Sequence, residues 1–125
     1  MNKLDGLRNK RGEIMAQTPM KLLSIETGTL TSSFTVTGGA YIKKQDKIVD
    51  AYISINDVDV EAGGVIANIP QGYRPIQDII VIGFEQLANN SILRFSVNST
   101  SGDVSSPTAI STNGRVRLKA SWMTS

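Results

Sequence analysis

The stretch TAISTNGRVRLKASW, residues 108–122, alternates apolar and polar side chains on both sides of an Asn-Gly pair. Alternation with a period of two is typical of a strand with one buried face. In the second arm the apolar positions are Val116, Leu118, Ala120 and Trp122. Asn-Gly between two such runs is a strong signal for a two-residue hairpin turn. The sequence therefore predicts two antiparallel strands that reverse direction at Asn113-Gly114.

Further strands are predicted toward the N-terminus, because β-branched and aromatic residues recur there between turn residues. They cover residues 29–37, 40–44, 47–55, 65–69, 79–84 and 92–98. The segment IIVIGF (79–84) is apolar at every position, which predicts burial on both faces. Short strands ended by Gly, Asn, Asp or Pro predict an all-β protein, specifically an antiparallel, jelly-roll-like β-sandwich.

Length and charge divide the chain into a body and a short N-terminal segment. The 125 residues suit one domain, and no run approaches the roughly 20 apolar residues of a membrane-spanning helix, so no membrane insertion is expected. Residues 1–21 have five basic and two acidic side chains, and the remainder has eight and nine. We expect residues 1–21 to be a neck or connector, helical over 1–16 or extended, and residues 22–125 to be the head. A nearly neutral body predicts no nucleic-acid binding.

The chain contains neither cysteine nor histidine. This composition excludes disulfides, thiolate chemistry and imidazole-based triads, so we expect a protein that is not an enzyme and has no cofactor. A carboxylate pair, as in glycosidases, stays open in principle. Asp57, Asp59 and Glu61 alternate along one segment, which is compatible with a cation site or with an edge strand whose acids face solvent. The sequence favours the strand, and we expect no metal.

Two polar loops are candidates for ligand binding, because binding groups concentrate on loops at strand ends. They are residues 85–90 and the Ser- and Gly-rich residues 99–106. Sugar recognition typically combines an aromatic ring with side chains that hydrogen-bond to hydroxyls. The predicted saccharide-binding residues are Glu85, Asn89, Asn90, Arg94 and Trp122, although a core position is the favoured interpretation for Trp122.

Residues 67–84, ANIPQGYRPIQDIIVIGF, contain a predicted structural corner. Pro70 ends a strand by withholding a backbone donor, Gly72 lets the chain reverse, and Pro75 keeps the preceding residue extended. Tyr73 is expected to pack the corner against the body. Arg74 belongs to the corner too, and its alternative role is to bind a carboxylate across a subunit boundary.

The order of these motifs resembles the C-terminal head domain of bacteriophage tail-fibre and baseplate receptor-binding proteins, chiefly of phages and prophages of Gram-positive bacteria. The resemblance covers roughly residues 29–124. It is carried by YIKKQDKIVDAYISI, GVIANIPQGYRP, IIVIGF, ILRFSVNSTSGDV and AISTNGRVRLKASWM.

The resemblance implies a small β-sandwich head that assembles as a homotrimer and attaches the virion to host cell-wall saccharides. It also implies a location in the virion, at the tail tip or baseplate, and contact with other tail proteins through the N-terminal segment. The alternative expectation is a structural or connector protein of the same tail apparatus, which binds another tail protein instead of a sugar.

Overall fold

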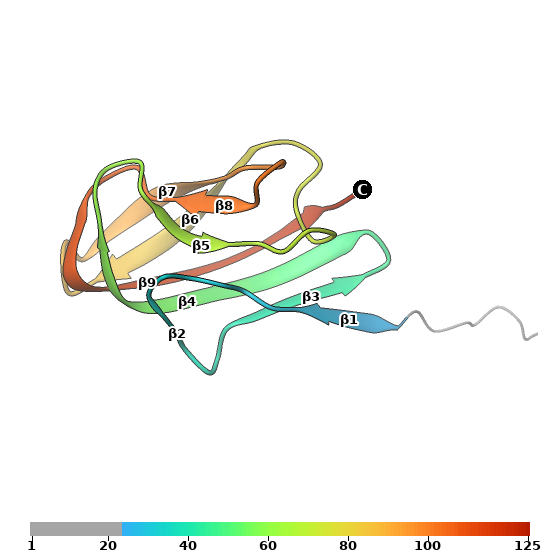
Figure 1. The fold of residues 1–125 in the computed structure, drawn as a ribbon, viewed down its shortest axis with the longest axis horizontal. Helices are drawn as coiled ribbons and strands as arrows, with labels where there is room; N and C mark the ends of the chain where they lie inside the picture. Colours follow the sequence, from blue (N-terminus) through green and yellow to red (C-terminus); the bar gives the residue numbers. More distant parts are fainter. Residues whose placement is uncertain (1–23) are drawn as a thin grey trace, which may run out of the picture.

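The computed structural model describes residues 24–125, which contain nine β-strands and no helix (Figure 1). The helix predicted at 1–16 and the neck predicted at 1–21 lie outside the described residues. The strands are β1 (Ile25–Gly28), β2 (Thr35–Val36), β3 (Tyr41–Gln45), β4 (Ile48–Val60), β5 (Val65–Asn68), β6 (Ile79–Gln86), β7 (Ser91–Val97), β8 (Asp103–Ser105) and β9 (Ile110–Met123).

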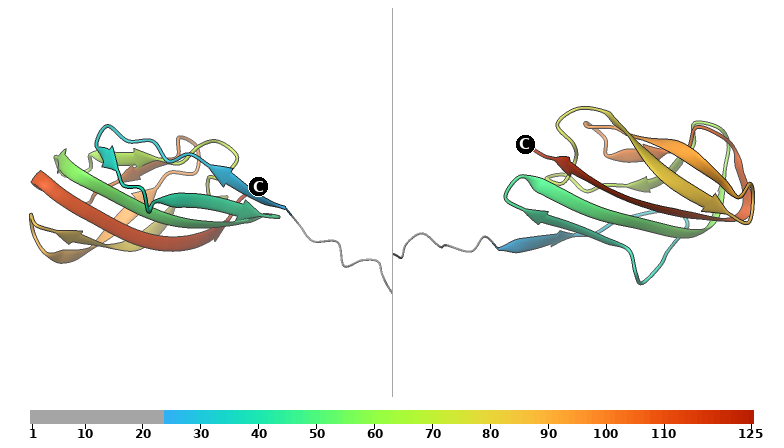
Figure 2. Two further views of the ribbon diagram at one scale, coloured as in Figure 1. Left: turned by 90° about the horizontal axis from the view of Figure 1, so that it is seen from below. Right: turned by 180° about the vertical axis from the view of Figure 1, so that it is seen from behind.

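All strand pairs are antiparallel and belong to one hydrogen-bonded sheet in the order β1-β3-β4-β9-β6-β7-β8-β5, with β2 paired to β4. The sheet curls so that β5 and β8 lie across from β3 and β4 (Figures 1 and 2). A bridge between Thr31 and Asn68 connects the β1–β2 segment to β5 and helps to close the curl. The predicted all-β, antiparallel fold is confirmed.

The inner face of the curled sheet forms the hydrophobic core. Strand alternation supplies it: in β4, Val49, Ala51, Ile53 and Ile55 are fully buried, whereas the residues between them are polar or more exposed. Their partners on β9 include Trp122 and Val116, and Phe95 and Val97 contribute from β7. Every second side chain of the longest strands therefore builds one common core.

The hairpin predicted at Asn113-Gly114 is wrong, because β9 runs unbroken through this pair. The register between β4 and β9 shifts twice nearby: Ile55 pairs with Val116, Val58 with Gly114, and Val60 with Ile110. Asn113 has a φ of 67° inside the second shift. The pair supplies a backbone conformation that a β-bulge needs, and here it bends one strand instead of reversing the chain.

Strand β6 also differs from its prediction, because only one of its faces is buried. Val81, Gly83 and Glu85 point inward, whereas the side chains between them are exposed. The predicted strand at 29–37 is likewise wrong over most of its length. Only Thr35–Val36 is a strand there, although Leu30 reaches the core as expected.

Asp57, Asp59 and Glu61 are exposed at the end of β4, which is an interior strand rather than the expected edge strand. Asp57 has a φ of 60° at the first register shift, and Val58 beside it is fully buried. Within residues 24–125 no three carboxylates are grouped so that they could hold a metal ion.

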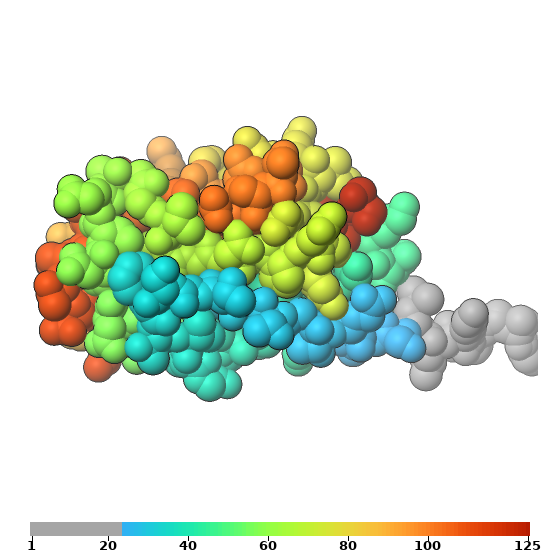
Figure 3. Space-filling model, viewed as in Figure 1, coloured from blue at the N-terminus to red at the C-terminus, as the bar shows by residue number. Residues whose placement is uncertain are grey.

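The corner at Pro70–Pro75 packs over β1 (Figure 3). The N–H of Tyr73 donates to the Pro70 carbonyl at 3.1 Å, and Gly72 has a φ of +92°. Lys44 Nζ donates to the Gly72 carbonyl at 2.8 Å and lies 4.8 Å from the centre of the Tyr73 ring. These contacts fasten the corner to β3.

Candidate functional site

Two of the five predicted saccharide-binding residues lie inside the protein. Glu85 is fully buried, and its carboxylate accepts hydrogen bonds from the N–H groups of Ala88 at 3.0 Å and Asn89 at 2.6 Å. Trp122 is buried in the core, as the favoured interpretation predicted, and its Nε1 donates to the Tyr73 carbonyl at 2.7 Å. Both polar groups hold the fold together, so we leave both out of the candidate site.

The other three predicted residues are exposed but do not converge with Trp122. Asn89 and Asn90 lie in the β6–β7 turn, and Arg94 lies on the outward face of β7 opposite Ile82. Trp122 lies four residues beyond Leu118, the β9 residue that pairs with Gly83. It is therefore level with Ile79 at the other end of β6, eight residues or roughly 25 Å from the start of the β6–β7 turn at 3.3 Å per residue. One sugar ring cannot contact both groups.

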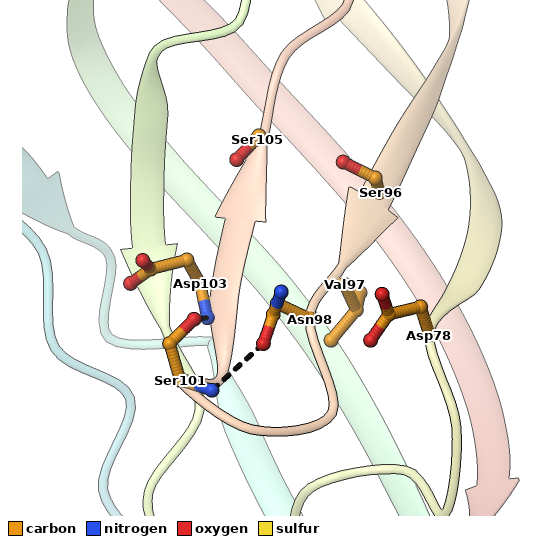
Figure 4. Close-up of a pocket in the computed structure, with 7 residues that line it drawn as sticks. All are labelled: Asp78, Ser96, Val97, Asn98, Ser101, Asp103 and Ser105. Carbon is orange, nitrogen blue, oxygen red and sulfur yellow. Dashed lines mark hydrogen bonds between the residues drawn. The ribbon is translucent and has the colours of Figure 1, made fainter.

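The structure instead has a polar hollow where β7, β8 and the chain before β6 meet (Figure 4). Its volume is about 170 Å³. Asp78 and Asp103 lie on opposite sides of it, and Asn98 lies between them with its amide nitrogen directed toward Ser96 and Ser105 (Figure 4). The remaining lining residues are Val97 and Ser101.

The loop that forms the floor of this hollow is held by its own polar groups. Asn98 Oδ1 accepts hydrogen bonds from the N–H groups of Thr100 and Ser101, both at 2.8 Å. The N–H of Gly102 donates to the Asn98 carbonyl at 2.8 Å, and Gly102 has a φ of +78°. This asparagine-nucleated turn fixes the loop conformation before any ligand arrives.

Two side chains from outside the loop also hold it. Arg74 donates from Nε to the Ile69 carbonyl at 2.8 Å and from Nη1 to the Thr100 carbonyl at 2.6 Å. Asn68 donates to the Ser101 carbonyl at 2.8 Å and to Asp103 Oδ1 at 2.9 Å. Arg74 therefore binds two carbonyl oxygens of its own chain. Its side chain connects the corner to the loop of the hollow.

Asp78 contributes a negative charge at the rim. Its Oδ1 accepts hydrogen bonds from the Ser99 N–H at 2.8 Å and from the Ser99 hydroxyl at 2.9 Å. These two bonds, the backbone one first, lower the pKa of Asp78 below its ordinary value. The carboxylate is therefore ionised at neutral pH and can accept further hydrogen bonds.

The hollow can bind a small molecule that is rich in hydroxyl groups. Carboxylates accept from hydroxyls, an asparagine amide donates to them, and serines do either. Ser96 and Ser105 pair through their backbones between β7 and β8, but within residues 24–125 their hydroxyl groups and the amide nitrogen of Asn98 make no hydrogen bond, so these side-chain groups are open to a ligand. The sequence marked part of this site through the Ser- and Gly-rich loop at 99–106, but nothing local indicated that Asp78 and Ser96 join it.

A second polar surface lies on the outward face of β3, β4 and β9. The rings of Tyr41 and Tyr52, a cross-strand pair, have centres 6.0 Å apart. Lys43 Nζ lies 4.8 Å from the centre of the Tyr41 ring. A hydrogen bond with Tyr41, and then the charges of Tyr41 and Asp50, raise the pKa of Lys119. The pairing of β4 with β3 and β9 thus brings two aromatic rings and a lysine with a raised pKa onto one surface.

Within residues 24–125 there is no helix long and apolar enough to cross a membrane. A scan of the chain against protein-family models found no match, and a search of curated proteins found no match either.

Proposed function

We propose that this chain is the receptor-binding head of a bacteriophage tail, a non-catalytic module that binds saccharides of the host cell wall. In this proposal it acts in the virion, at the tail tip or baseplate, as a homotrimer joined to other tail proteins through residues 1–21. The motif order that includes the Pro70–Pro75 corner supports the phage assignment. The polar hollow supports saccharide binding.

The observation that carries the proposal is the preorganised loop at the hollow. Its turn is fixed by Asn98, Asn68 and Arg74, so little conformational freedom is lost when a ligand binds. The hollow is smaller than the pockets of about 300–1,000 Å³ that enclose drug-sized ligands. It suits one sugar unit of a surface polymer, and affinity in a multivalent assembly would come from several weak sites.

The environment of Asp78 favours binding over hydrolysis. A glycosidase needs one carboxylic acid with a raised pKa to protonate the leaving group. Asp78 has a lowered pKa, because Ser99 donates two hydrogen bonds to its charged form. Asp78 is therefore suited to accept hydrogen bonds from a sugar and poorly suited to deliver a proton.

The test measures binding of fluorescently labelled protein to a panel of Gram-positive bacteria, with purified wall polysaccharide as competitor. A Ser96→Gln variant fills the hollow with a longer polar side chain, and a Ser111→Gln variant makes the same change at an exposed position elsewhere. We expect strain-specific, competable binding that Ser96→Gln weakens at least about tenfold and Ser111→Gln leaves unchanged.

Equal binding by wild type and Ser96→Gln would move the saccharide site away from the hollow, with the Tyr41–Tyr52 surface as the next to test. An absence of binding to every strain and polysaccharide would refute the receptor-binding proposal. The alternative is a connector protein of the tail, and the exposed apolar residues of β6 favour it because they suit a protein partner. Recovery of a tail protein in a pull-down, without saccharide binding, would support that alternative.

A further inference from the structure

Four large apolar side chains form a continuous exposed strip on the outward face of the β6–β7 hairpin. Ile80, Ile82 and Phe84 alternate along β6, and Ile92 pairs with Phe84 from β7. Their exposed fractions are 61%, 57%, 38% and 71% in that order. The right-hand view of Figure 2 shows β6 and β7 side by side on this outer surface. We call these four residues the apolar strip.

The strip is large for a surface that meets only water. The exposed fractions correspond to roughly 450 Å² of apolar surface if a fully exposed residue of this size presents about 200 Å². That is comparable with the largest patch on a typical monomer, and such patches are often functional. The sequence shows the same anomaly, because β6 is apolar on both faces although the curled sheet covers only one. An exposed apolar face of this kind is typical of a surface that binds a partner.

We propose that the apolar strip packs against another copy of this chain. A standard protein–protein interface buries about 800 Å² per partner, and the strip alone supplies roughly half of that area. Arg94 on β7 and Arg117 on β9 flank the strip, opposite Ile82 and Phe84 respectively, and their aliphatic stems extend it. Phenylalanine and arginine are enriched at protein interfaces, and the centre of an interface is more apolar than the rest of the surface.

The charges also suit a second copy. The outward positions of β6 and β7 include no carboxylate: they are the strip, Gln86, Arg94 and Ser96. Elsewhere the same chain exposes Asp57, Asp59 and Glu61 at the end of β4. A second copy therefore provides both an apolar surface and acidic groups that can pair with Arg94. The resemblance to trimeric heads implies how many copies assemble, whereas this proposal identifies the surface through which the copies contact each other.

The first test uses two isoleucines with the same exposed fraction. Ile82 lies in the strip, and Ile48 lies outside it at the start of β4; both are 57% exposed. We expect the full wild-type chain to sediment as an oligomer at micromolar concentration, Ile48→Asp to do the same, and Ile82→Asp to be monomeric. An Ile82→Thr variant, which keeps a β-branched residue, should show a weaker but measurable loss if Ile82→Asp fails to fold.

Assembly is measured without any saccharide, so its result is independent of the proposed receptor. A wild-type chain that is monomeric up to submillimolar concentration would overturn the proposal. So would an Ile82→Asp variant that assembles as well as Ile48→Asp.

The second test exploits the absence of native cysteine, because the only thiol is then the introduced one. We would compare the alkylation rates of Ile92→Cys and Ile48→Cys over a range of protein concentrations. The expected result is that the thiol at position 92 reacts more slowly as concentration rises, whereas the thiol at position 48 reacts at a constant rate. Protection at position 92 that is independent of concentration would indicate cover from within the same chain, for example by residues 1–23, and would refute contact with a second copy.

Discussion

Removal of the Arg74 guanidinium should loosen the corner and the hollow together. Arg74 donates two hydrogen bonds, to the carbonyl oxygens of Ile69 at 2.8 Å and Thr100 at 2.6 Å. Hydrogen bonds to charged groups contribute about 1.5–3 kcal/mol each, and the partial exposure of Arg74 places both near the lower limit. We therefore expect Arg74→Ala to lower the free energy of unfolding by about 3 kcal/mol, or the melting temperature by roughly 10–20 °C for a domain of this size.

The measurement is urea denaturation at neutral pH, in which the fluorescence of Trp122 reports the fraction of unfolded protein. Arg74→Lys should lose about half as much stability, because an ammonium on a shorter side chain cannot reach both carbonyl oxygens in the planar geometry of a guanidinium. Arg115→Ala, at an exposed position of β9, is the matched control and should stay within about 0.5 kcal/mol of wild type. If Arg74→Ala is as stable as Arg115→Ala, the two carbonyl contacts do not stabilise the corner and the loop.

Two further changes test the core and the rim of the hollow. A Cβ at Gly83 would lie 2.7 Å from Phe95 Cε2 and 2.9 Å from Leu118 Cβ. Gly83→Ala should therefore lower the free energy of unfolding by about 1–3 kcal/mol, which thermal denaturation measures. An unchanged melting temperature would contradict this expectation. Because Ser99 lowers the pKa of Asp78, the charged carboxylate stabilises the fold above its ordinary pKa of 3.8, and this contribution is lost as the pH falls through the lower folded-state value. In Asp78→Asn, the free energy of unfolding should therefore fall less steeply than in wild type as the pH is lowered below 3.8. The same pH dependence in both proteins would show that ionised Asp78 does not stabilise the fold.

Strand alternation predicted much of the fold because each strand has one face in a common core. The segments at 40–44, 47–55, 65–69, 79–84 and 92–98 all correspond to observed strands. The Asn113-Gly114 pair was misleading because a positive φ serves a bulge as well as a hairpin turn. Which of the two forms depends on the partner strand, and β4 continues past the pair as far as Val60.

The candidate site was less predictable because its residues come from separate parts of the chain. Asp78 precedes β6, whereas Asn98 and Asp103 flank the turn between β7 and β8. Only the pairing of β7 with β6 and β8 brings them together. Glu85 shows the opposite case, since a carboxylate next to a polar loop resembles a ligand-binding group in the sequence. In the structure it is buried beneath that loop and binds the backbone.

The hydrogen bonds that Arg74 and Asn68 donate to the loop at the hollow have a consequence for how this surface can evolve. Arg74 holds the loop through the carbonyl oxygen of Thr100, and Asn68 does the same through that of Ser101. Every amino acid carries that carbonyl, so substitutions at either position leave both contacts available. The loop can therefore exchange side chains at its tip while the backbone that presents them stays in place. A lineage under pressure to follow a changing target could diversify these positions without first having to rebuild the fold beneath them.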